Sequence, residues 1–281
     1  MLLTTRKNMT EKRKKDIRLV VSDIDGTLIR RGEGFPKEVE QAAAELKKRG
    51  ILFTFASGRL PYMITPFAES LGIEIPVCAC NGTLIYRKDE ILENHPLRLL
   101  ELRPLIETAL LREMTVLYSL NGTEYCMREN EAVRRKQAER GSYHPIRPVR
   151  EEEWESLWAD KVNISDEQGE ISSLLEWEQP LEGSCEITHY GNQGLEIVRA
   201  GFGKIYGVRQ ICAGLGISME QVLAIGDNEN DNEMLTQAGI GAAVGNAEAA
   251  TKACADLTAR KESGAGAAEI IRRICLEENE K

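Results

Sequence analysis

Residues 19–29 read Leu-Val-Val-Ser-Asp-Ile-Asp-Gly-Thr-Leu-Ile, an apolar run followed by two carboxylates spaced one residue apart. The run has the length and branching of a buried strand, and Gly26 breaks the pattern directly after it. Side chains alternate along a strand, so Asp23 and Asp25 share a direction where the extended geometry persists. Two like charges this close repel unless a cation, a shared proton or a reaction partner offsets them. Because open α/β sheets bind ligands at the carboxyl ends of their strands, the pair is a candidate site.

A turn or a calcium loop is the alternative interpretation of Asp-x-Asp-Gly. An EF-hand loop needs a further ligand and, at its twelfth position, a glutamate. This chain has Thr27 and Gly34 at those places. The motif alone does not separate a turn from a site, so the rest of the chain decides.

Three other segments supply matching chemistry. Residues 51–59 form a second apolar run that ends in Ser-Gly-Arg, and residues 222–231 form a third that ends in paired acids beyond a glycine. Lys204 precedes a helical pattern of apolar residues. Phosphoryl transfer to a carboxylate needs these parts: a nucleophile, a second acid to move protons, and oxygen ligands for magnesium. A lysine and a hydroxyl can hold the remaining phosphoryl oxygens.

Four segments together resemble the motifs of the haloacid dehalogenase superfamily of phosphatases: Asp23-Ile-Asp-Gly-Thr, Ser57-Gly-Arg, Lys204 and Gly226-Asp-x-x-Asn-Asp. The arrangement most resembles the Cof-type branch, in which a large cap domain is inserted between the second and third motifs. The resemblance covers about residues 17–86 and 190–272, and the middle segment resembles the branch only in length and position. In one departure, Ile205 follows the lysine where the branch usually has glycine.

The resemblance implies a role for each catalytic position. Asp23 would be the nucleophile and a magnesium ligand. Asp25 would be the general acid and base, with its backbone carbonyl also reaching the metal. Ser57 would hydrogen-bond the transferring phosphoryl group, and Lys204 would neutralise that group while steadying Asp23.

The resemblance also implies further binding residues. Asp227 would be the second carboxylate on magnesium, with Asp231 near the metal either directly or through water. Thr27 and Asn230 would support the loop and the phosphate, and Gly58 would lie at the substrate.

Each position also has a structural interpretation. Ser57 could cap a helix that follows the strand, and Lys204 could be a solvated surface lysine. Asp227 and Asp231 could cap and charge the start of a helix. These interpretations are reasonable one by one, but the order of all the motifs together favours a site.

Asn81 and Gly82 lie between two runs of strand-forming residues, at 77–80 and 83–86. Asn-Gly is the strongest short hairpin signal, so a two-residue turn is the favoured interpretation. The family resemblance adds a second possibility, since an Asn-Gly at this place often faces the phosphate or the substrate. Asn81 is therefore also a candidate substrate contact.

The composition is ordinary for a globular chain, with 281 residues, 42% hydrophobic and 29% charged. This length favours two domains over one. The net charge of −9 argues against a general nucleic-acid binder. Residues 1–19 hold seven basic residues against two acidic ones, which predicts a disordered, solvated tail over 1–16. No apolar stretch has the form of a signal peptide or the length of a membrane span.

Seven cysteines show no zinc spacing, and most lie in apolar stretches. Buried thiols in a reducing compartment are favoured over a metal site, which predicts a cytoplasmic protein.

Alternating strands and helices predict an α/β fold with a doubly wound, Rossmann-like parallel sheet. We expect this core over residues 17–86 and 190–281, with an inserted α+β cap over 87–189. Core helices are expected near 36–49, 61–71, 204–214, 231–238 and 264–276, and core strands at 19–23, 51–56, 222–226 and 240–244. In the cap we expect helices near 97–113, 129–140 and 168–177, a hairpin at Asn121-Gly122, and strands near 161–165 and 184–189.

The sequence thus predicts a magnesium-dependent phosphomonoesterase that acts through an aspartyl-phosphate on small metabolites, such as sugar phosphates or phosphorylated cofactors. The expected partner is the small phosphorylated substrate, with no nucleic acid and no membrane, and with monomer and homodimer both open. A phosphosugar mutase of the phosphomannomutase-like branch is the nearer alternative. A non-catalytic metabolite sensor on the same scaffold is the more distant one.

Overall fold

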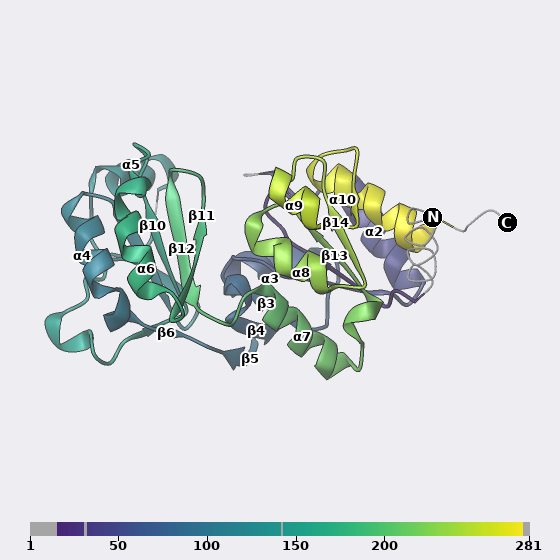
Figure 1. Ribbon diagram of the computed structural model, residues 1–281, viewed down its shortest axis with the longest axis horizontal. Helices are drawn as coiled ribbons and strands as arrows, with labels where there is room; N and C mark the ends of the chain where they lie inside the picture. Colours follow the sequence, from purple (N-terminus) through teal and green to yellow (C-terminus); the bar gives the residue numbers. More distant parts are fainter. Residues whose placement is uncertain (1–15, 31–32, 142, 278–281) are drawn as a thin grey trace. The chain divides into compact units, whose positions relative to one another are not determined.

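The computed structural model describes residues 16–30, 33–141 and 143–277 (Figure 1). The basic tail expected over 1–16 lies, apart from Asp16, outside the described residues. The chain divides into two compact units. The first runs through Leu92 and resumes at Lys204, and the second is Glu93–Gly203.

A five-stranded sheet forms the centre of the first unit, and all its neighbouring strands are parallel. Short apolar runs form these strands because both faces of the sheet are covered. In spatial order the strands are β15 (Leu257–Thr258), β14 (Ile240–Ala243), β13 (Val222–Gly226), β1 (Leu19–Ser22) and β2 (Leu52–Phe55).

Helices cover both faces of this sheet. Val20 belongs to one apolar cluster, whereas Leu19 and Val21 belong to another, as the alternation of side chains along β1 requires. The first cluster includes residues of α2 (Lys37–Lys48), α3 (Pro61–Ser70) and α10 (Ser263–Ile271). The second includes residues of α7 (Lys204–Leu215) and α8 (Asn232–Gln237). The doubly wound α/β core predicted from the sequence is confirmed.

The strand register fixes which residues meet at the carboxyl edge of the sheet. Ser22 at the end of β1 pairs with Ile225 of β13 on one side and with Phe55 of β2 on the other. The segments that follow these three residues therefore begin at the same level. This register places the first, second and fourth sequence motifs side by side.

The second unit is built on an antiparallel sheet with an apolar core on one face. That core includes residues of α4 (Arg103–Leu111), η4 (Ile171–Trp177) and α6 (Glu178–Leu181). Helix α5 (Glu131–Arg140) and a two-stranded pair, β6 (Leu97–Arg98) with β9 (Trp158–Ala159), complete the unit. The sheet order is β11 (Cys185–His189), β12 (Gly194–Arg199), β10 (Lys161–Ser165), β7 (Thr115–Leu120) and β8 (Thr123–Cys126).

Two predictions about this region are wrong. The expected core segment from 190 onward includes β12, but β12 pairs with β10 and β11 and so belongs to the second unit. The helix expected over 97–113 is helical in the α sense only from Arg103. Its first residues form β6 and a 3₁₀ segment, η2 (Leu99–Leu102), because their leucines serve a strand pair and the apolar core.

The Asn81-Gly82 prediction is right about the hairpin and wrong about its turn. β3 (Val77–Ala79) and β4 (Leu84–Arg87) pair antiparallel, and β5 (Glu90–Asn94) follows β4 in the same sheet. Ala79 pairs with Leu84, so the connection is the 3₁₀ segment η1 (Cys80–Gly82) plus Thr83. Cys80 and Asn81 both have positive φ, 49° and 53°, and the N–H of Thr83 closes the connection by donating to the carbonyl of Cys80.

Among the described residues, no helix is both long enough and apolar enough to cross a membrane.

Candidate active site

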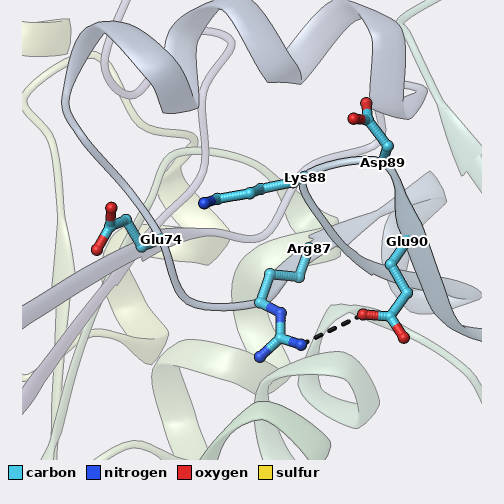
Figure 2. Close-up of a pocket in the computed structure, with 5 residues that line it drawn as sticks. All are labelled: Glu74, Arg87, Lys88, Asp89 and Glu90. Atoms are coloured by element: carbon cyan, nitrogen blue, oxygen red, sulfur yellow. Dashed lines mark hydrogen bonds and ion pairs between the residues drawn. The ribbon is translucent and has the colours of Figure 1, made fainter.

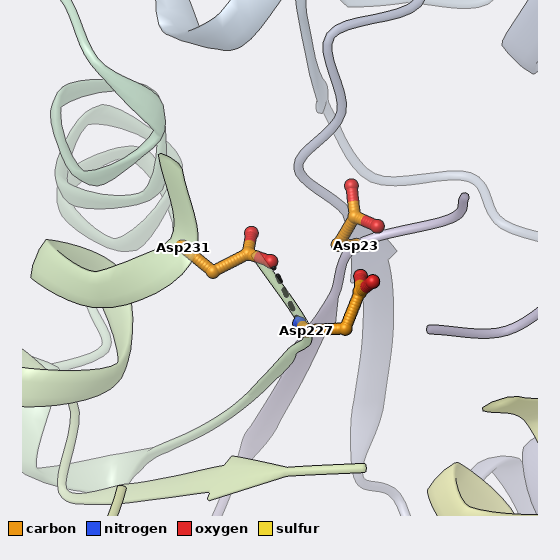
Figure 3. A group of neighbouring side chains, drawn as sticks. All are labelled: Asp23, Asp227 and Asp231. Carbon is orange, nitrogen blue, oxygen red and sulfur yellow. Dashed lines mark hydrogen bonds between the residues drawn. The ribbon is translucent and has the colours of Figure 1, made fainter. Parts of the chain in front are cut away.

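Three buried or half-buried aspartates meet at the carboxyl edge of the first unit's sheet (Figure 3). Asp23 follows β1, and Asp227 follows β13 directly. Asp231 ends the 3₁₀ segment η6 (Glu229–Asp231), where helix α8 begins. One oxygen from each carboxylate lies within 4.8 Å of the others. The structure thus brings together the three carboxylates that the sequence predicted as metal ligands.

Lys204 is the cation of this cluster. It is the first residue of α7 and is only 2% exposed. Its Nζ donates to Oδ1 of Asp23 at 2.7 Å and to Oδ1 of Asp231 at 2.8 Å. The interpretation of Lys204 as a solvated surface lysine is therefore wrong.

Burial and crowding shape the ionisation of the cluster. Burial raises the pKa of Asp23 well above its ordinary value, and the charges of Asp231 and Asp227 add to that rise against the opposing charge of Lys204. Burial likewise raises the pKa of Asp227 to about 6. Burial disfavours the charge on Lys204, but Asp23 and Asp231 outweigh it and raise the pKa of that ammonium. The ammonium of Lys204 therefore stays charged, whereas ionisation of Asp23 and Asp227 is disfavoured.

The donor set fits a divalent cation. Three carboxylates, when all are ionised, leave an excess of two negative charges over the one ammonium in a largely buried place. Magnesium takes oxygen ligands, commonly one or two carboxylates together with water and phosphate oxygens. A cation here would favour the ionised form of Asp23, whose pKa is raised first by burial and then by repulsion from Asp231 and Asp227.

Asp231 has a structural task as well. Its Oδ2 accepts hydrogen bonds from the backbone N–H of Asp227 at 2.9 Å and of Asn228 at 3.2 Å. The predicted alternative of a helix-capping carboxylate is therefore realised in part, at the short segment η6. Gly226 permits this loop, because a Cβ at that position would lie 2.5 Å from Cβ of Asp231.

Thr27 donates its hydroxyl hydrogen to Oδ1 of Asp227 at 2.6 Å. This contact joins the loop after β1 to the loop after β13 and orients Asp227. The predicted support of the loop by Thr27 has a physical basis in this bond, whereas its contact with substrate stays a prediction.

Ser57 is buried and follows β2 by two residues. Its Oγ accepts the backbone N–H of Arg59 at 3.2 Å, so its own hydrogen points elsewhere and can be donated to a phosphoryl oxygen. Helix α3 begins only at Pro61, with Leu60 before it, so Ser57 does not cap that helix. Gly58, between Ser57 and Arg59 in the chain, is half-buried.

Asn81 and Asn230 contact one another. Nδ2 of Asn230 donates to Oδ1 of Asn81 at 3.0 Å, which ties η1 to η6 across the first unit. Asn81 is buried and has φ 53°, a left-handed conformation that asparagine tolerates better than most residues. Both residues were predicted from the sequence as candidate substrate contacts, but the contact between them was not predicted.

The side chain of Asp25 pairs with an arginine and not with Lys204, the cation of the carboxylate cluster. The Asp25 side chain is 48% exposed and pairs with Arg59, Nε to Oδ2 at 2.6 Å and Nη2 to Oδ1 at 2.7 Å. Arg59 ends the Ser57-Gly-Arg motif, which does not by itself indicate a role for the arginine. Only the tertiary fold shows the pairing, because 34 residues separate the two partners.

Asn246 is a second residue that the sequence did not single out. Its Nδ2 donates to the carbonyl of Gly26 at 2.9 Å, and its Oδ1 accepts the backbone N–H of Ser263. It thereby fixes the turn that carries Asp25 and Thr27. Its signal in the sequence is weak, since Gly-Asn after a strand is a common turn.

A separate pocket in the first unit lies at the turn between β4 and β5 (Figure 2). Charged side chains line it, and Arg87 pairs with Glu90 across it. It contains none of the predicted site residues. The pocket lining consists of Glu74, Arg87, Lys88, Asp89 and Glu90.

Fold and site together define an α/β enzyme whose acidic, lysine-bridged centre lies at the ends of parallel strands. The family model of the haloacid dehalogenase-like hydrolases matches residues 20–271. The chain therefore belongs to this family. It is an enzyme of the phosphatase class, a hydrolase of phosphoric monoesters.

Two curated relatives are similar over nearly their whole length. The 5-amino-6-(5-phospho-D-ribitylamino)uracil phosphatase of Bacillus subtilis is 27% identical over 261 residues, covering 93% of this chain and 97% of the relative. The pyridoxal phosphate phosphatase of Escherichia coli is 27% identical over 262 residues, covering 85% and 92%. Among solved structures, a HAD/COF-like hydrolase from Plasmodium vivax has the same fold, with a TM-score of 0.80 at 22% identity and coverage of 94% and 98%.

Proposed function

We propose that the protein is a magnesium-dependent phosphomonoesterase that hydrolyses small phosphorylated metabolites through a phosphorylated Asp23. The observation that carries this proposal is the contact between Lys204 and Oδ1 of Asp23. It fixes one oxygen of the carboxylate, and among the described residues no hydrogen bond is formed to the other, Oδ2. A carboxylate held in this way can attack phosphorus.

Asp25 supports the proton transfers that this chemistry requires. In the first step a bond forms between Asp23 and phosphorus, the ester P–O bond breaks, and the leaving oxygen takes a proton from Asp25. In the second step Asp25 takes a proton from water, the water oxygen bonds to phosphorus, and the bond to Asp23 breaks. Two steps with one shuttling group replace a single difficult hydrolysis.

Donors around Asp23 support binding of the phosphoryl oxygens. The ammonium of Lys204 has three N–H donors, of which Asp23 and Asp231 take two, so one is left for a phosphoryl oxygen. The hydroxyl of Ser57 is a second donor. Such donors stabilise the charge that develops in the transition state.

The metal would be held by Asp23 and Asp227, with Asp231 beside them and the carbonyl of Asp25 in reach by analogy with the family. When bound, magnesium neutralises phosphate charge and lets an anionic nucleophile approach. Both oxygens of Asp231 already accept hydrogen bonds, which favours a contact through water for this residue.

The substrate class rests on the relatives. Their names specify 5-amino-6-(5-phospho-D-ribitylamino)uracil and pyridoxal phosphate, both small polar phosphate monoesters. We propose a substrate of the same size and charge for this chain. All seven cysteines are free thiols and six are buried, which supports a reducing compartment and so the cytoplasm.

The test measures release of inorganic phosphate from a panel of phosphorylated metabolites that includes the two named substrates, with magnesium and with EDTA. We expect phosphate release that EDTA abolishes, and none from Asp23→Asn. Asp89→Asn, an exposed aspartate at the β4–β5 turn, is the matched control and should be fully active. Full activity of Asp23→Asn would refute the nucleophile. Isomerisation of a hexose phosphate without phosphate release would support a mutase instead.

A second measurement identifies the intermediate. Protein quenched in acid during turnover is digested, and its peptides are analysed by mass spectrometry. We expect one phosphoryl group on the peptide that contains Asp23 and none on the peptide that contains Asp227.

A further inference from the structure

Arg59 makes a two-point contact with the carboxylate of Asp25, the proposed proton-transfer group. Its Nε and Nη2 each donate to a different oxygen of Asp25, at 2.6 and 2.7 Å. A two-point contact of planar guanidinium and planar carboxylate fixes both the position of the carboxylate and its rotation. A single contact would fix only the position.

The guanidinium is itself held in place. Its central carbon lies 5.0 Å from the ring centroid of Phe67 on α3, and only 17% of the Arg59 side chain is exposed. The backbone of Arg59 is also tied, since its N–H binds Ser57 and its carbonyl accepts the N–H of Cys80. Arg59 is therefore a rigid support, whereas Asp25 alone would be a half-exposed, mobile side chain.

We propose that Arg59 is the positioning residue for proton transfer, and that it sets the direction from which Asp25 reaches the leaving oxygen. This inference rests on the proposed function, since it takes Asp25 as the acid and base. Arg59 acts through Asp25 and does not touch the substrate.

The two-point grip is compatible with both halves of the reaction. When one oxygen of Asp25 carries a proton, that oxygen gives up its guanidinium N–H, and the other hydrogen bond still holds the group. Once the proton has passed to the leaving oxygen, both contacts form again. The carboxylate is then in place to take a proton from water in the second step.

A comparison of two substrates distinguishes positioning of Asp25 by Arg59 from direct binding of the substrate by Arg59. A p-nitrophenolate leaves as a stable anion without a proton, whereas the alkoxide of glycerol 2-phosphate needs one. The ratio kcat/KM reports only the steps up to the first irreversible one, in which Asp25 serves as an acid. Loss of positioning should therefore lower kcat/KM for glycerol 2-phosphate much more than for p-nitrophenyl phosphate.

The experiment compares Arg59→Ala, Arg59→Lys, Asp25→Asn and the double variant Arg59→Ala/Asp25→Asn in the full chain with magnesium. General acid catalysis typically contributes about 10²- to 10⁴-fold. We expect Arg59→Ala to lower kcat/KM for glycerol 2-phosphate about 100-fold and for p-nitrophenyl phosphate less than tenfold. Lysine should restore part of the loss, because an ammonium supplies one point of contact.

Non-additivity is the decisive result. If Arg59 acts through Asp25, the double variant loses no more than Asp25→Asn alone. Losses that add, with KM raised equally for both esters, would show that Arg59 binds substrate directly and would overturn the proposal. Wild-type kinetics of Arg59→Ala would overturn it too.

Arg103 offers a matched control in the second unit. It also makes a two-point contact to a carboxylate, Glu151 at 2.6 and 2.8 Å, and its guanidinium lies over the ring of Trp154. Arg103→Ala removes the same chemical groups and should leave the ratio between the two esters unchanged. If Asp23→Asn stays active, the proposed function fails, and if only the Arg59 variants behave as wild type, the positioning role alone fails.

Discussion

Gly26 and Asp227 leave no space for a side chain between them. A Cβ on Gly26 would lie 2.2 Å from Oδ2 of Asp227, and Gly26 has φ +83°, which L side chains rarely adopt. The glycine that breaks the first motif therefore leaves room for Asp227, the proposed metal ligand of the fourth. The close approach explains why this turn allows nothing larger.

Gly26→Ala should weaken activation by magnesium, because it displaces Asp227, a proposed metal ligand. The added methyl group pushes the carboxylate of Asp227 away from Thr27 and from the proposed cation, so we expect at least about tenfold weaker activation by magnesium, roughly 1.4 kcal/mol of binding. Gly50→Ala is the control, since Gly50 has φ +70° but nothing within 4 Å of its added Cβ. It should lose similar stability through backbone strain and keep its activity. Equal magnesium activation in Gly26→Ala and the wild type would contradict the interpretation.

Asp227→Asn should stabilise the protein in EDTA at high pH. Burial raises the pKa of Asp227 from 3.8 to about 6. The pKa of Asp227 is higher in the folded state than in the unfolded state, so the protonated carboxyl contributes favourably to the free energy of unfolding. This contribution is fully present below pH 3.8 and is lost as the pH rises through 6. Asparagine avoids that loss and keeps an oxygen for Thr27. At pH 8 the gain should be about 1–3 kcal/mol, and it should disappear near pH 4.

Thermal unfolding with and without magnesium measures this effect. With saturating magnesium the order should reverse, because the wild type gains binding energy that the variant lacks. If Asp227→Asn were less stable than the wild type in EDTA at pH 8, ionisation of Asp227 would not destabilise the folded protein, and the prediction would be wrong.

Lys204→Met should unfold far more easily than the wild type. Removal of the ammonium leaves Asp23 and Asp231 buried without their shared partner, which costs about 3–5 kcal/mol. Lys204→Met/Asp231→Asn should recover part of this stability, because one of the unpaired charges is gone. Neither variant should have activity. Urea unfolding measures the difference, and equal midpoints for the two variants would contradict the prediction.

The second unit should fold alone only with β12 included. β12 lies between β11 and β10, so a fragment ending at 189 lacks an inner strand and exposes two edges. We expect fragment 93–203 to unfold cooperatively with temperature and fragment 93–189 to show no cooperative transition by circular dichroism. Cooperative unfolding of the shorter fragment would show that β12 is dispensable.

The sequence predicted the core well because its strands are buried on both faces. Val222–Gly226 reads as one apolar run, and β13 has these bounds. The assignment of β12 was wrong for the converse reason. Nothing in the local pattern of Gly194–Arg199 tells which strands it pairs with, and pairing alone decides the unit to which it belongs.

Some parts of the candidate site could be predicted from the sequence and others could not. Asp23, Asp227 and Lys204 could be predicted because each follows or precedes a recognisable element, and parallel strands bring such positions to one edge. The contact between Arg59 and Asp25 could not be predicted, since an arginine in a loop is usually solvated. Its partner and its supporting ring depend on tertiary contacts that no periodicity encodes.

The chain leaves the second unit at Gly203, and the next residue is the lysine that joins Asp23 to Asp231. This adjacency sets a rule for protein engineering. The second unit can be exchanged with that of a relative as one contiguous insert, but the downstream splice must keep the register of α7 to the residue. One amino acid added or deleted between Lys204 and the buried residues of α7 that follow it would turn the lysine about 100° around the helix axis and withdraw its charge from Asp23.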